Sequence, residues 1–70
     1  MFFSTLEAKY RRDLEAVRQE VRNLIIMGMR PDISPEERAL IRNLERSARA
    51  EAKLRKRALD QLLEEEGKSR

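Results

Sequence analysis

The chain lacks the two side chains that most often carry out acid–base and nucleophilic catalysis. Its 70 residues include no histidine and no cysteine, so the usual general base and the strongest nucleophile in proteins are both missing. Without cysteine, neither a disulfide bond nor a thiolate metal site can form. We therefore expect a protein that is not an enzyme, that uses no cofactor and that acts on no small-molecule substrate.

Three other kinds of sequence feature are also missing. No glycine-rich phosphate-binding loop is present, and no apolar run is long enough for a signal peptide or a membrane span. The acidic run Glu64-Glu65-Glu66 cannot converge on one metal ion, because consecutive residues of a helix point in different directions. The sequence thus predicts a cytoplasmic protein without a metal site and without membrane contact.

What the chain does contain is charge. Charged residues make up 41% of the sequence and aromatic residues only 4%, which is typical of solvated helices and coiled coils. Seventy residues form one small domain, close to the size at which a single core is marginal and oligomerisation commonly adds stability.

The segment from residue 28 to residue 37 predicts a helix stop followed by a helix start. Ser34 suits the N-cap, Pro35 the first helical position, and Glu37 the third position of a capping box. Upstream, Gly28 can adopt the left-handed conformation that ends a helix. Met29 would then fold back onto Leu24, as in a Schellman motif.

Further signals mark the outer ends of the two helices. Ser4-Thr5-Leu6-Glu7 is a second capping box, and Gly67 offers a stop after the second helix. We predict one domain over residues 1–70, with a helix at about 5–27, a turn at 28–34, a helix at about 35–66 and a tail at 67–70. The fold class is all-α, a two-helix antiparallel hairpin.

The apolar positions of the two helices can face each other along the hairpin. Folding back at the turn sets Leu24 opposite Leu40 and Ile41, Val21 opposite Leu44, and Tyr10 opposite Leu54. Phe2 and Phe3 would cover the aliphatic pair at 62 and 63. Because two helices bury little apolar surface, we expect the hairpin to dimerise into a four-helix bundle.

Surplus apolar residues gather near the turn and predict a protein interface. Such clusters with flexible methionines usually mark contact surfaces. Two interpretations stay open, because the patch can build a homodimer core or can dock on another protein. The predicted interface residues are Leu24, Ile25, Ile26, Met27, Met29, Ile33, Leu40 and Ile41.

A basic stripe along the second helix predicts a second surface. A row of cations at spacings of four and three could follow the phosphates of a duplex. The alternative is a solvated helix face, in which Glu45 pairs with Arg49 and Glu51 with Arg55. The net charge of the whole chain is only +3. The stripe consists of Arg38, Arg42, Arg46, Arg49, Lys53 and Lys56.

Three functions fit these patterns. The first is a small non-enzymatic interaction module, a helical-hairpin homodimer that binds and regulates a larger protein by inhibiting, chaperoning or adapting it. The second is an RNA- or DNA-binding helical bundle that uses the basic stripe. The third is a structural coiled-coil subunit of an assembly.

Overall fold

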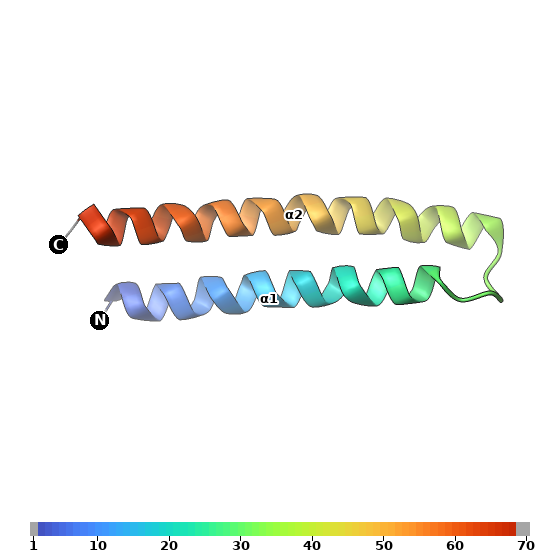
Figure 1. Cartoon of the computed structure of the whole chain (residues 1–70), viewed down its shortest axis with the longest axis horizontal. Coiled ribbons are helices and arrows are strands. Elements are labelled where there is room, and N and C mark those ends of the chain that lie inside the picture. Colours follow the sequence, from blue (N-terminus) through green and yellow to red (C-terminus); the bar gives the residue numbers. More distant parts are fainter. Residues whose placement is uncertain (1, 69–70) are drawn as a thin grey trace.

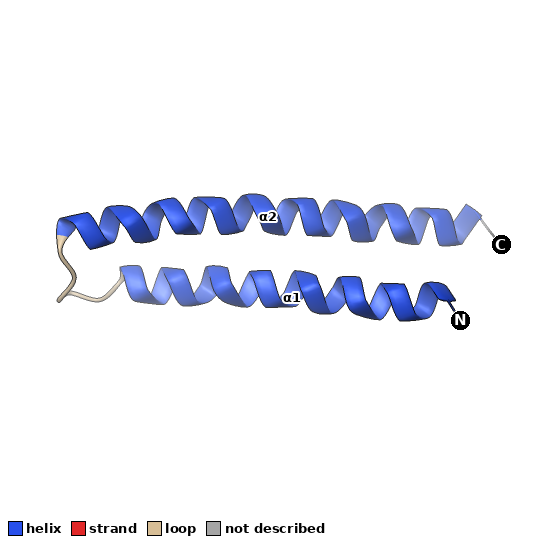
Figure 2. Cartoon of the chain, turned by 180° about the vertical axis from the view of Figure 1, so that it is seen from behind, coloured by secondary structure: helices blue, strands red, loops and turns tan. Residues whose placement is uncertain are grey.

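The protein is a hairpin of two long antiparallel helices (Figure 1). The structure, a computed structural model, describes residues 2–68, and the side chains of residues 5–68. Helix α1 spans Phe2–Gly28 and helix α2 spans Pro35–Lys68, and no strand occurs among the described residues (Figure 2). The prediction of an all-α two-helix hairpin is confirmed.

The start of α2 is capped by Ser34. The backbone N–H of Glu37 donates a hydrogen bond to Ser34 Oγ (3.1 Å), and that of Arg38 donates to the Ser34 carbonyl (2.9 Å). Pro35 is the first helical residue, where its missing N–H costs no bond. The first turn also carries Glu36 and Glu37, whose negative charges interact favourably with the positive end of the helix dipole. The N-cap predicted from the sequence is therefore confirmed.

The end of α1 differs from the Schellman motif predicted above. Gly28 is the last residue of α1, and no described glycine has a positive φ. The N–H of Met29 instead donates to the carbonyls of Ile25 (3.2 Å) and Ile26 (3.1 Å), and the N–H of Arg30 donates to that of Met27 (3.3 Å). These bonds within a tightened last turn satisfy the terminal carbonyls without a left-handed residue. The side chain of Met29 stays 77% exposed, so its predicted return onto Leu24 is wrong.

Both helices extend beyond the limits predicted from the sequence. Because α1 already begins at Phe2, Ser4 lies inside the helix. The side chains of Phe2, Phe3 and Ser4 lie outside the described residues, as do the cap and the aromatic packing predicted for them. At the other end, α2 continues through Gly67 to Lys68, so Gly67 does not stop the helix.

A narrow core fills the space between the helices. The α2 side of this core consists of Ile41, Ala48 and Leu59, with Ala52 half-buried between them. These residues recur at spacings of seven, four and seven, which keeps them on one side of a helix. Small alanine side chains let the two helices approach closely in the middle of the hairpin. The buried residues of α1 are Leu14, Val17 and Leu24.

The pairing of the helices is shifted by about one helical turn from the predicted register. A Cβ atom placed on Gly28 would lie 3.5 Å from Ile41 Cγ2. Tyr10 borders a hollow with Ala58 and Leu62 rather than facing Leu54. The shift arises because the first turn of α2 extends beyond the end of α1 (Figure 1). Leu40, Leu44 and Leu54 are exposed rather than packed against α1, whereas Leu24 and Ile41 pack in one cluster as expected.

The hairpin is much more extended than a compact domain of its size. Its dimensions are 54 × 15 × 11 Å and its radius of gyration is 16.1 Å, against about 11 Å for a compact domain of this length. Its accessible surface is 5747 Å², whereas a compact monomer of this mass exposes about 4,600 Å². The isolated chain thus leaves an unusually large surface in water.

Candidate interaction surfaces

Three leucines of α2 lie on the surface beside the core. The exposed fractions of Leu40, Leu44 and Leu54 are 59%, 48% and 61%. The 100° rotation per residue places all three on one flank of α2. We call Leu40, Leu44 and Leu54 the leucine flank. Ser47 and Glu51, both exposed, lie between the leucines on this flank.

Met27 extends the leucine flank onto α1. Asp13 of α1 and Ala58 of α2 border one hollow between the helices. Met27 follows Asp13 by fourteen residues, and Leu44 precedes Ala58 by the same number. Since fourteen residues return a helix to nearly the same side, Met27 and Leu44 lie on that side of the hairpin at the same height. The side chain of Met27 is 46% exposed.

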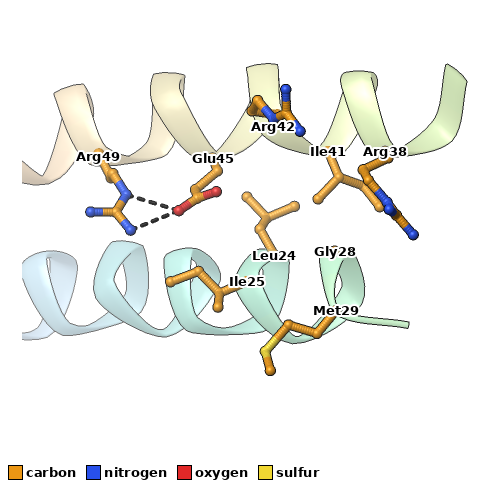
Figure 3. A pocket seen from close by; sticks show the side chains of 9 residues that line it. All are labelled: Leu24, Ile25, Gly28, Met29, Arg38, Ile41, Arg42, Glu45 and Arg49. Atoms are coloured by element: carbon orange, nitrogen blue, oxygen red, sulfur yellow. Dashed lines mark hydrogen bonds and ion pairs between the residues drawn. The ribbon is translucent and has the colours of Figure 1, made fainter. Parts of the chain in front are cut away.

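The residues predicted as a protein interface do not form one patch. Leu24 and Ile41 are buried in the core, and Ile25 and Ile33 are half-buried. Ile26 is 63% exposed and lies on the side of α1 away from Leu24, because two residues rotate a helix by about 200°. Figure 3 shows Leu24 pointing between the helices toward Ile41, whereas Met29 points away from α2. Of this predicted set, Leu40 belongs to the leucine flank, and Met27 lies beside the flank on α1.

The other side of the hairpin carries a groove between the helices with cationic rims. Two adjoining hollows share Ile25 and Arg49, so we treat them as one groove and call it the basic groove. Its apolar floor is formed by Val21, Leu24, Ile25, Ile41 and Ala52. The rim on α1 carries Arg18 and Arg22, and the rim on α2 carries Arg38, Arg42, Arg49 and Lys53.

Carboxylates neutralise only part of the basic groove. Arg49 donates two hydrogen bonds to Glu45 Oε1, at 2.7 and 3.0 Å, in the pairing expected from the sequence (Figure 3). Arg22 pairs with Glu15 at 2.6 Å. The other four rim cations, Arg18, Arg38, Arg42 and Lys53, form no ion pair within residues 2–68. The groove therefore keeps an excess of positive charge on both rims.

The predicted basic stripe divides into two parts. Arg38, Arg42, Arg49 and Lys53 border the groove, whereas Arg46 and Lys56 do not. Lys56 pairs with Asp60 at 3.0 Å.

Two of the groove cations lie on α1 and were not predicted from the sequence. Arg18 and Arg22 are four residues apart and adjoin Val21 and Ile25, which have the same spacing. On α1, two cations thus recur at the same spacing as two neighbouring apolar residues. This pattern is the sequence signal that indicates the α1 rim of the groove.

Other kinds of site are not formed by the described residues. Across residues 2–68, no three or more acidic side chains gather where they could hold a metal ion. Neither α1 nor α2, over that same range, has a segment long and apolar enough to cross a membrane.

Comparison with known proteins identifies no relative of this chain. Searches against protein-family models, curated proteins and solved structures found no match to this chain. The two surfaces described above therefore carry the functional argument alone.

Proposed function

We propose that the protein is a non-enzymatic interaction module that dimerises through the leucine flank and binds a larger protein. The observation that carries this proposal is the exposure of Leu40, Leu44 and Leu54 on one flank of α2. Large aliphatic side chains aligned over a long surface usually mark a contact with another protein. Here they sit beside a core that holds six buried residues among side chains 5–68, which gives the isolated hairpin little stability.

A symmetric dimer fits the spacing of the leucines. A two-fold axis midway between Leu44 and Leu54 places Leu44 of each copy opposite Leu54 of the other. The same arrangement places Leu40 opposite Ala58 and puts the polar pair Ser47 and Glu51 together near the axis. This alternation of apolar and polar layers is typical of antiparallel helix pairing. The two hairpins then form the four-helix bundle predicted from the sequence.

The excess surface of the single hairpin also supports association. The chain exposes 5747 Å², about 1,100 Å² more than a compact monomer of equal mass would expose. A standard protein interface removes about 800 Å² from each partner. Dimerisation through one flank would thus bring the exposed surface per chain close to that of a compact protein.

Light scattering on matched variants tests this proposal. We expect a wild-type mass of twice the 8.3 kDa of one chain. Leu54→Glu should reduce the mass to that of a single chain, because the interface would bury an unpaired carboxylate. Ala8→Glu is the control, since Ala8 is exposed and lies on the side of α1 away from α2 and from the leucine flank. A monomeric wild type, or an unchanged mass for Leu54→Glu, would exclude the leucine flank as the interface.

A further inference from the structure

We propose that the basic groove binds an acidic amphipathic helix of the partner protein, one with a narrow apolar stripe and carboxylates on both sides of it. The proposal rests on the proposed function, because it names the kind of partner that the module binds. It uses a surface different from the dimer interface. The leucine flank and the basic groove lie on opposite flanks of α2, so both can be occupied together.

The shape of the groove fits a third helix. Its α2 rim runs from Arg38 to Lys53, which corresponds to about 22 Å along a helix axis, or about four turns. Val21 and Ile25 on α1 are four residues apart, as are the apolar anchors that a helix presents when it lies in a groove. A helix docked between α1 and α2 would complete a three-helix arrangement and cover this apolar floor.

The charges on the rims determine the sequence that such a helix must have. Cations line both rims, with Arg18 and Arg22 on α1 facing the row on α2. Residues that flank the apolar stripe of a docked helix meet these rims, so both flanks must be acidic. A helix with basic flanks would be repelled on both sides. Four groove cations form no ion pair within residues 2–68, and they provide most of this selectivity: Arg18, Arg38, Arg42 and Lys53.

The apolar floor favours a protein helix over nucleic acid as the occupant. Phosphates would satisfy the cationic rims equally well. A nucleic-acid duplex, however, presents no apolar stripe to cover Val21, Ile25 and Ala52, which would remain in water. No aromatic side chain borders the groove among the described residues, so there is no platform on which unpaired bases could stack.

Fluorescence anisotropy with designed probes tests the proposal on the full chain. The probe is a labelled 18-residue helical peptide with leucines at a and d positions and glutamates on both flanks. A second peptide keeps the leucines and carries lysines on the flanks, and a third keeps the glutamates but scrambles the leucine positions. A short RNA duplex is the fourth probe. We expect binding of the first peptide only.

Two double variants with the same change in charge locate the binding site. Arg42→Glu with Lys53→Glu alters the groove rim, whereas Arg12→Glu with Arg57→Glu alters the outer sides of the two helices. All four side chains are exposed and form no ion pair within residues 2–68. The groove variant should bind the acidic peptide about tenfold more weakly or worse, because two attractions become repulsions. The outer variant should stay within about twofold of wild type.

A floor variant separates helix binding from simple charge attraction. Ile25→Ala keeps a good helix former but removes apolar contact, so it should weaken the acidic peptide several-fold. Helicity measured by circular dichroism on the same samples verifies folding. Binding of the scrambled peptide as tight as that of the leucine-stripe peptide would overturn the proposal. Equal weakening by both double variants would overturn it as well.

Two further outcomes separate this proposal from the dimer proposal. Binding of the RNA duplex with no binding of the acidic peptide at about 100 µM protein would assign the groove to nucleic acid and overturn the helix proposal. The mass of the same samples, measured by light scattering, reports on the dimer independently. A dimer that does not bind the peptide would refute only the groove proposal. A monomer that binds the peptide would refute only the dimer proposal.

Discussion

Replacing Gly28 with alanine tests the way in which α1 ends. Gly28 is helical, with no positive φ, so alanine should fit its backbone without strain. The added Cβ would meet only Ile41 Cγ2, at 3.5 Å, which is an ordinary van der Waals contact. Alanine is favoured over glycine in helices by up to about 1 kcal/mol, and compatible Gly→Ala changes stabilise proteins by about 0.4–1 kcal/mol.

The expected result is a more stable hairpin. The free energy of unfolding should rise by about 0.5–1 kcal/mol, and the Tm by about 3–6 °C for a domain of this size. Urea titration followed by circular dichroism measures the change. Both proteins must be compared at one concentration, because the proposed dimerisation would make the midpoint depend on concentration.

A left-handed Gly28 would give the opposite result. The Schellman motif predicted from the sequence would put alanine in a conformation that costs about 1–2 kcal/mol, so the Tm would fall. Gly67→Ala is the matched control, because Gly67 is also helical but a Cβ there meets nothing within 4 Å. Its effect should be smaller, since the last turn of a helix frays. A destabilised Gly28→Ala would refute the helix end described here.

Two further substitutions test the cap and the core. Ser34→Ala should lower the free energy of unfolding by about 1 kcal/mol, because the 3.1 Å bond to the Glu37 N–H is lost; an unchanged urea midpoint would show that the cap contributes nothing. Ala48→Leu should destabilise the hairpin by about 1–3 kcal/mol, because Ala48 is only 5% exposed between the helices. Ala50→Leu adds the same volume on the exposed side and should leave the stability nearly unchanged, so equal effects of the two would contradict the close approach of the helices.

The local signals in the sequence were sufficient to predict the hairpin. Ser34, Pro35 and Glu37 define a helix start through their own backbone and side-chain chemistry, which needs no distant partner. The end of α1 could not be read in the same way. A glycine near a helix end fits a left-handed cap, but it also fits a helix that continues through it, and the local sequence does not distinguish them.

The division between core and surface could not be predicted from the apolar pattern. Leu40 and Ile41 are neighbours, and both fit the apolar seam of α2, yet only Ile41 is buried. The choice depends on the rotation of α2 about its axis and on how far its first turn extends past Gly28. Both are set by packing along the whole hairpin rather than by any local signal. The same rotation buries Ala48 and leaves Leu44 and Leu54 at the surface.

The rotation of α2 also explains how one thin hairpin can carry the two surfaces proposed to bind partners. With Ala48 and Ala52 facing α1, the leucine flank lies on one side of them. The groove cations of α2 lie on the other side: Arg38, Arg42, Arg49 and Lys53. A dimer formed through Leu44 and Leu54 leaves the rims at Arg42 and Lys53 facing outward on each copy. Dimerisation would then present two basic grooves on one particle, and a partner with two acidic helices would bind both at high effective concentration. The small core that makes the single hairpin marginal is thus consistent with a protein whose surfaces, rather than its interior, carry its function.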